Sequence, residues 1–421
     1  MQAGTASASG SHANVGASGR TSANRAGWIN VVVAAIMMVA TLPGRTQGLG
    51  LITEPMLADL QLDRVTYANI NLWATLIGAA ICLPIGRLFD RVGLRIASMA
   101  ITVFLSAVVW MMSTMAGGVM LLFALVLATR ALGQSALSVA SITAVGKSFD
   151  SRVGVAMGVY SFLLSVFFAA AFVFVGNSVR VNGWRAAWAQ VAIALIVAGF
   201  LALLLRERTS ASSSLPSSDS GGSNDGLTLG EALRTPAFWI FGGATSLFGL
   251  VSSGLGLFNE AVLAERGFDQ QTYVRFLAGT SIIALVGQLG CGWLTLRWSM
   301  QRLLGIAMFL YAVAIGALPL LRTQVELWFF AVLIGLAGGM ITVMFFAVWR
   351  RAFGAAHLGR IQGAAQTLTV LASAIGPLIF AQSAARTGSY FPALWILAPC
   401  VLAVSIAAFR VSLPRATLAD A

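Results

Sequence analysis

The chain has 421 residues, of which 58% are hydrophobic and only 10% are charged. Soluble globular proteins carry about 25% charged residues, so this composition excludes a water-soluble fold. It also excludes disorder for most of the chain, because disordered chains have low hydrophobicity. The net charge of +12 resides in short connections between apolar runs. This placement is typical of the inside loops of a membrane protein and argues against nucleic-acid binding.

The amino-terminal residues 1–26 are rich in Ala, Gly and Ser, and we expect them to form a disordered cytosolic tail. The apolar run that follows is too long for the hydrophobic region of a signal peptide. We therefore expect this run to be kept as the first membrane span.

Twelve apolar runs follow one another along the chain, and each is long enough for one helix across a membrane. Lipid cannot satisfy free backbone groups, and continuous runs without alternation indicate helices rather than a barrel. The runs lie at about 28–51, 67–86, 96–115, 119–141, 154–176, 184–205, 238–259, 272–294, 303–321, 327–349, 361–382 and 391–410.

One long polar segment interrupts this series after the sixth run, and its Ser- and Gly-rich composition is typical of a flexible linker. The predicted fold is an all-α membrane protein with twelve transmembrane helices in two six-helix, pseudo-symmetric bundles. We expect the bundles at 27–208 and 236–412, a cytosolic linker at 209–235 and a cytosolic tail at 413–421.

The basic residues predict the orientation of the chain. With the amino terminus inside, the outer connections hold only a minority of the Lys and Arg residues, namely Arg64, Arg180, Arg185, Arg266, Arg275, Arg322 and Arg386. Arg45 and Arg130 fall within spans, and all the others lie inside. This bias predicts that both termini lie in the cytoplasm. We expect the protein to lie in the inner membrane. We expect a monomer.

The two halves also resemble each other. A shift of 206 residues pairs Thr66-Tyr67 with Thr272-Tyr273 and Arg91 with Arg297. Two six-span halves in parallel repeat are the arrangement of rocking transporters, whose substrate site lies between the halves near the membrane midplane.

The loop between the second and third runs reads Gly86-Arg87-Leu88-Phe89-Asp90-Arg91-Val92-Gly93-Leu94-Arg95. With twelve spans and a central linker, it resembles the signature loop of the major facilitator superfamily. Within that family the chain is most similar to the oxalate/formate and monocarboxylate porters. The resemblance implies a conformational latch formed by Gly86, Asp90, Arg91, Gly93 and Arg95, in which Asp90 docks near the start of the eleventh span. A solvated turn that only sets topology is the alternative.

Two departures from the family pattern limit what the resemblance implies. The second half has Leu296 where Asp90 stands in the first half, so only one copy of the loop is intact. The fifth span lacks the Gly-Pro pair that drug/proton antiporters of the family carry. This absence argues against drug efflux.

Arg130 is the most informative single residue, because it lies about 16 Å into the fourth span, near the centre of the membrane. A buried guanidinium is costly unless it is paired or hydrated. Gln134 and Ser138 follow at helical spacing and share its face. Arg130 either faces a substrate cavity or bonds to carbonyl groups of neighbouring helices.

Arg45 follows Pro43-Gly44, which can interrupt the first span. It either contacts an anion beside a broken helix or extends its charged end to the outer interface. Further candidates for substrate contact are Tyr160 in the fifth span, Gln288 in the eighth and Gln366 in the eleventh.

No carboxylate lies near the centre of a span, and the two histidines lie outside the spans. Proton coupling through a central acid is therefore not expected, and a cationic site favours an anionic substrate. We expect no enzyme activity, because no convergent acids, His or nucleophile–base pair lie within the spans. The three cysteines are dispersed in apolar runs, which argues against a disulfide framework. No CxxC or Cys/His cluster is present to hold a metal, and no cofactor is expected.

The sequence thus predicts a secondary transporter that moves a small anion, such as a carboxylate, by alternating access. Efflux of drugs or amphiphiles is the alternative within transport. A membrane substrate sensor and a membrane-embedded enzyme are alternatives from other classes. The expected partners are a small-molecule substrate and the lipid bilayer, and no nucleic acid.

Overall fold

The computed structural model describes residues 27–81, 91–146, 148, 153–205, 226–354 and 357–414. These residues are nearly all helical, and their only β pairing is an isolated bridge between Gly226 and Gly354. The predicted all-α fold is confirmed.

The helices of the first half begin with a short apolar helix and end with a long bent one. They are Gly27–Val39, η1 (Leu42–Gly44), α2 (Thr46–Gly50), α3 (Thr53–Leu60), α4 (Arg64–Ile81), α6 (Leu94–Thr114), α7 (Val119–Thr129), η2 (Arg130–Leu137), α8 (Ser138–Gly146) and α9 (Val153–Ala202). η1 is a 3-10 turn and η2 is a stretch of π-helix.

The second half is more regular. Its elements are α10 (Leu229–Leu233), α11 (Pro236–Ala264), α12 (Gln270–Leu294), α13 (Met300–Ala317), the 3-10 turn η3 (Leu318–Leu320), α14 (Gln324–Phe353), α15 (Leu358–Thr387) and α16 (Phe391–Arg410).

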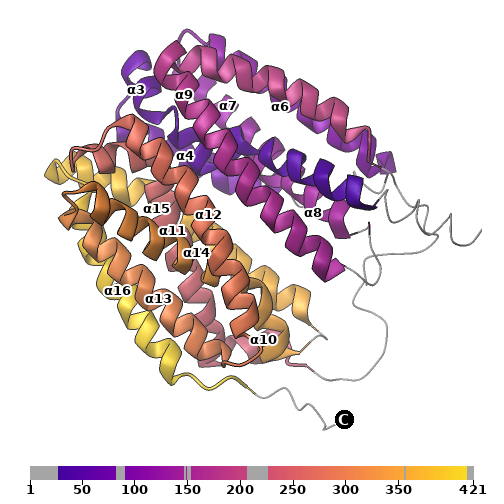
Figure 1. Ribbon diagram of the computed structural model, residues 1–421, viewed down its shortest axis with the longest axis vertical. Helices are drawn as coiled ribbons and strands as arrows, with labels where there is room; N and C mark the ends of the chain where they lie inside the picture. The colour runs from indigo at the N-terminus through magenta and orange to yellow at the C-terminus, as the bar shows by residue number, and fades with distance from the viewer. Residues whose placement is uncertain are drawn as a thin grey trace, which may run out of the picture.

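Within the described residues, 9 helices are long and apolar enough to cross a membrane. One of them contains two predicted spans, because α9 bends at Gly183, where φ is +81°. The first span is broken into shorter helices, and α4 reaches Ile81, where the described segment ends. With the bend in α9, the broken first span and the described part of α4 taken into account, the described elements match the twelve predicted runs. They are arranged in two bundles (Figure 1).

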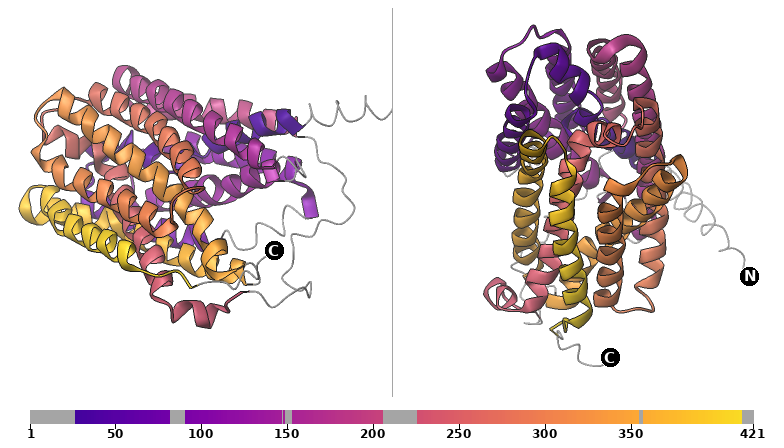
Figure 2. Two further views of the ribbon diagram at one scale, coloured as in Figure 1. Left: turned by 60° about the horizontal axis from the view of Figure 1, so that its bottom comes forward. Right: turned by 90° about the vertical axis from the view of Figure 1, so that its left-hand side faces the viewer.

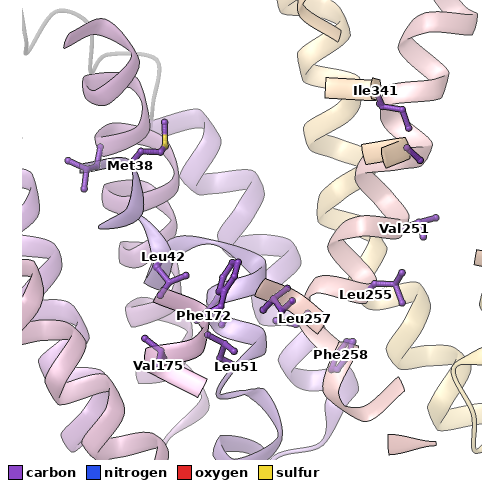
Figure 3. Packing of buried hydrophobic residues seen from close by; sticks show 14 of the residues in the cluster. Met38, Leu42, Leu51, Phe172, Val175, Val251, Leu255, Leu257, Phe258 and Ile341 are labelled. Atoms are coloured by element: carbon purple, nitrogen blue, oxygen red, sulfur yellow. The ribbon is translucent and has the colours of Figure 1, made fainter. Parts of the chain in front are cut away.

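The two bundles lie together at the end that carries α3, and their helices diverge toward α10 (Figures 1 and 2). Contacts between the halves join α4 to α15, α9 to α12 and α2 to α11. Glycine makes this approach possible, since a Cβ on Gly50 would collide with the carbonyl oxygen of Gly256. Figure 3 shows buried apolar side chains of both halves, including Phe172 of α9 and Leu257 of α11.

The end of the predicted linker contains a folded segment. Thr228 and Glu231 form a reciprocal cap on α10, and Leu227 donates its N–H to the carbonyl of Phe353 at 2.9 Å. Hydrogen bonds from the backbone N–H and the hydroxyl of Thr228 lower the pKa of the Glu231 carboxyl. The short helix α10 thus lies within the predicted linker of 209–235. A helix of five residues is too short to be found from composition.

Candidate functional site

The first span breaks at Pro43-Gly44, as its sequence predicted. Thr41 donates its hydroxyl proton to the carbonyl of Met38 at 2.6 Å, and the chain then enters η1. Arg45 after the turn is extended, with φ −91° and ψ 149°. A Cβ on Gly44 would collide with the carbonyl oxygen of Thr129, so only glycine permits η1 to lie this close to α7 and η2. The break leaves the carbonyl of Gly44 free to accept a side-chain donor.

Arg130 supplies that donor. Its Nη1 donates to the carbonyl of Gly44 at 3.1 Å, to Thr46 Oγ1 at 3.0 Å and to Gln134 Oε1 at 2.7 Å. Its Nη2 donates to Asn71 Oδ1 of α4 at 2.8 Å. The side chain is only 2% exposed, and its Nε has no hydrogen-bond partner within the described chain. Every acceptor is neutral, so the positive charge of Arg130 is solvated by the protein but not neutralised.

Arg45 lies beside it and is half-buried. Its Nε donates to Thr41 Oγ1 at 2.6 Å, and its Nη2 contacts Met38 Sδ at 2.8 Å and Ser138 Oγ at 3.3 Å. The guanidinium carbon lies 5.3 Å from the ring centroid of Phe168 of α9, which is cation–π distance. In the described residues, Nη1 of Arg45 makes no hydrogen bond to protein. Arg45 therefore offers an uncommitted donor in a partly exposed side chain, whereas the unpartnered Nε of Arg130 is buried.

Two positive charges thus flank one broken helix, and no carboxylate is among their contacts. The ion pairs of the described residues lie elsewhere and join Arg64 to Glu54 and Arg185 to Asp59. An anion placed beside Arg45 would gain Coulomb energy and would offset the cost of holding two guanidinium groups in a low-dielectric region.

The structure brings together most of the site residues predicted in the first half. Gln134 and Ser138 follow Arg130 along η2 and α8, and they bond Arg130 and Arg45 respectively. Tyr160 of α9 is buried, and its hydroxyl lies 2.7 Å from Ser141 Oγ. Since Ser141 donates to the carbonyl of Ala34 at 2.6 Å, the Tyr160 hydroxyl is the donor of this pair. Tyr160 links α8 and α9 to the first helix.

The predicted residues of the second half do not join this cluster. Gln366 on α15 is exposed and Gln288 on α12 is half-buried. Neither side chain forms a hydrogen bond to another described residue, and neither contacts Arg45 or Arg130.

Three contributors to the site were not predicted from the sequence. They are Asn71, Thr46 and Phe168, which contact the two guanidinium groups from α4, α2 and α9. Asn71 could have been found from the sequence, because it is an amide inside an apolar run. In the structure it is 1% exposed. Thr46 and Phe168 carried none, because hydroxyl and aromatic residues are common in membrane helices.

The predicted latch is described only in part. Gly86 and Asp90 lie outside the described residues. Arg91 and Arg95 are exposed, and Gly93 has a φ of +84° immediately before α6. This conformation favours glycine and directs the chain into the third span.

The sequence profile of the Major Facilitator Superfamily matches residues 28–377. The chain belongs to the major facilitator superfamily. It is therefore a multi-pass membrane transporter and not an enzyme. A comparison with curated protein sequences finds no match.

Solved structures of this superfamily share the fold. One is a bacterial homologue of the human lysosomal transporter Spinster, in an inward-facing, unoccupied conformation, with 15% identity and a TM-score of 0.69. The match covers 91% of this chain and 96% of that one. The nucleoside transporter NupG has 12% identity and a TM-score of 0.72 over 91% of this chain and 98% of its own. At these identities the likeness establishes the fold and leaves the substrate open.

Proposed function

We propose that this superfamily member transports a small organic or inorganic anion, such as a carboxylate, by alternating access. In the proposed orientation it lies in the inner membrane with both termini in the cytoplasm. Oxalate and monocarboxylates are the first substrates to test, because the overall pattern of the chain resembles the porters for these anions.

One observation carries the proposal. Arg45 and Arg130 place two guanidinium groups beside the break in the first span, and their described hydrogen-bond partners are all neutral. A neutral substrate would leave both charges without a counter-ion. A carboxylate would supply one, and it would accept a hydrogen bond from the free Nη1 of Arg45.

The two arginines have different proposed roles. Arg130 holds the break open through the carbonyl of Gly44 and contributes a fixed positive potential. Arg45 contacts the anion directly, and Ser138 and Tyr160 lie close to it through α8 and α9. Gln134, Gln288 and Gln366 are candidates for contact when the halves rearrange.

The test is thermal stabilisation of the purified protein by sodium oxalate, sodium lactate and uridine, the last as a neutral comparison. A ligand at about 100 times its Kd stabilises the folded state by about 2.7 kcal/mol, which raises the melting temperature measurably. We expect a carboxylate to stabilise the wild type, and Arg45→Gln to lose the effect. Arg302→Gln removes an exposed guanidinium on α13 and should keep it. Stabilisation by uridine and by neither carboxylate would reject the proposal.

A further inference from the structure

A cavity of about 1040 Å³ lies on the side of the molecule, between the two halves. It runs between residues 169–182 of α9 and residues 278–282 of α12, and Gln190 borders it at one end. We call this feature the lateral groove. Its size is at the upper end of the range for small-molecule sites.

The lateral groove is separate from the arginine site. Among the described residues, none that lines the groove forms a hydrogen bond or a cation–π contact with Arg45 or Arg130. Asn177 in the groove follows Phe168 by nine positions, which at about 100° per residue places it on the opposite face of α9. Since Phe168 covers Arg45, the groove faces away from the site.

Most of the lateral groove is apolar and open. Phe174 and Val181 are 62% and 69% exposed, although both belong to a helix long and apolar enough to cross a membrane. Ala169 and Ala170 present only small side chains on the α9 wall of the groove, whereas Trp328 of α14 fills the space beside the Cα of Gly279 on the other wall. Such a surface is suited to an alkyl chain.

One end of the lateral groove is polar. Ser178 donates to Gln190 Oε1 at 2.8 Å and accepts a weaker bond from Asn182 Nδ2 at 3.4 Å. Asn177 is exposed, and its amide forms no hydrogen bond with any described residue. The amide of Asn177 is therefore available to a polar group of a molecule that lies in the groove.

The dimensions match one leaflet of a bilayer. From Asn182 at the helix bend to Ala169 is thirteen residues, or about 20 Å along α9. One leaflet of the hydrocarbon core is about 15 Å thick. The groove is thus about 5 Å longer than the hydrocarbon of one leaflet. Because Asn182 adjoins the bend at Gly183 between the two spans of α9, we expect its polar end at the depth of headgroups and glycerol esters, and its apolar part at the depth of acyl chains.

We propose that the lateral groove binds one membrane phospholipid from the leaflet at the Asn182 end of α9. An acyl chain lies along Ala169, Ala170 and Gly279. Ester or phosphate oxygens of the lipid accept hydrogen bonds from the amides of Asn177 and Gln190. This inference does not depend on the identity of the transported substrate.

The test is native mass spectrometry of the full chain in detergent, titrated with palmitoyl-oleoyl phosphatidylglycerol. Ala170→Trp fills the groove, and Asn177→Leu removes the free amide. Val197→Trp is the matched control, because Val197 lies later in α9, is 56% exposed and does not line the groove. We expect the wild type and the control to hold one lipid that Ala170→Trp loses. Asn177→Leu should weaken its apparent affinity about three- to tenfold, the effect of one hydrogen bond.

Each other outcome overturns the proposal. Equal lipid retention in all four proteins would place the lipid elsewhere. Retention of detergent in preference to the phospholipid would make the groove a site for single-chain amphiphiles. A dimer that Ala170→Trp dissociates would make it an interface between two copies. Gel filtration of each variant shows whether the protein is folded and monodisperse before the titration.

Discussion

At the scale of single residues, Arg130 shows how a membrane protein keeps a positive charge at the centre of a span. Four neutral acceptors surround its guanidinium, and hydrogen bonds to charged groups contribute about 1.5–3 kcal/mol each. These bonds offset the free-energy cost of removing water from the guanidinium, but they do not neutralise its charge. The sequence left open whether Arg130 bonds to neighbouring helices or faces a cavity. In the structure it donates to the first span and to α4, and its role at the substrate cavity stays a proposal.

Substitution of Arg130 should therefore affect both folding and binding. Arg130→Gln leaves the carbonyl of Gly44 and the amide of Asn71 without a donor, and each unsatisfied group costs about 1–3 kcal/mol. We expect a lower melting temperature, expression that persists, and loss of anion uptake. Arg130→Lys should recover only part of the uptake, since Lys lacks the planar fork. Anion affinity that is unaltered in Arg130→Gln would show that its charge plays no part in binding.

The sequence predicted some of the contacts in this site and not others. Helical spacing was enough to place Gln134 with Arg130, because residues four apart share a face. It could not place Asn71 or Phe168 beside the arginines, since these contacts depend on how separate helices pack. Gln366 was chosen as part of a polar stripe at helical spacing in the eleventh span, and Gln288 as an isolated polar residue of the eighth. The structure leaves both apart from the cluster.

At the scale of elements, the break in the first span and the π-helix at η2 form one packed unit. Gly44 lies against the backbone of Thr129 and Gln134, at the junction where α7 becomes η2. π-helical segments occur often at functional sites. The irregular backbone of η1 is stable at this depth because protein groups, including Arg130, satisfy it.

Gly44→Ala should disturb this unit. The added methyl group would meet backbone atoms that cannot move aside, and overpacking of this kind costs about 1–3 kcal/mol. Gly243→Ala is the matched control, because a Cβ there has no atom within 4 Å. We expect a lower melting temperature and a weaker carboxylate response for Gly44→Ala only. Equal behaviour of the two variants would show that η1 can shift without cost.

The positions of the membrane-spanning helices could be predicted closely from the composition of the chain. Apolar runs of about twenty residues predicted the spans, and the second half of the chain matches them with longer helix ends. The bend at Gly183 and the η1 break depend on single backbone conformations, and hydropathy does not report these. Pro43-Gly44 gave a local signal for a break, and Gly183 gave none that distinguished it from the many other glycines.

At the scale of the whole molecule, the halves meet at the α3 end and diverge toward α10. Under the proposed orientation the α10 end is cytoplasmic, so this arrangement is open to the inside. Gly50 is central to it, because its Cα faces the carbonyl oxygen of Gly256 across the two halves.

Gly50→Val should oppose closure at the α3 end, because its side chain would occupy the space of that carbonyl. Spin labels at the exposed positions Ala58 of α3 and Ala264 of α11 report the separation. We expect a longer mean distance than in wild type. Gly243→Val, where a Cβ has no neighbour within 4 Å, is the control and should leave the distance unchanged. A wild-type distribution for Gly50→Val would contradict this role.

Asp90→Asn should shift the equilibrium in the other direction. The proposed latch places the Asp90 carboxylate at the positive amino-terminal end of the eleventh span when the protein is open to the outside. Such a contact contributes about 0.3–2 kcal/mol. Its loss should increase the inward-open population and slow transport, with ligand affinity in each state nearly intact. The same pair of labels should then report more of the shorter distance, and an unchanged distribution would reject the latch.

The most direct test of anion transport is exchange of radiolabelled oxalate or lactate by the full chain in proteoliposomes loaded with the same unlabelled anion. We expect wild-type protein and Arg302→Gln to exchange at least one of the two anions. We expect Arg45→Gln to lose about nine-tenths of that rate and Arg45→Lys to recover part of it. Exchange of uridine by the wild type, with neither carboxylate exchanged, would contradict the account, as would full exchange by Arg45→Gln.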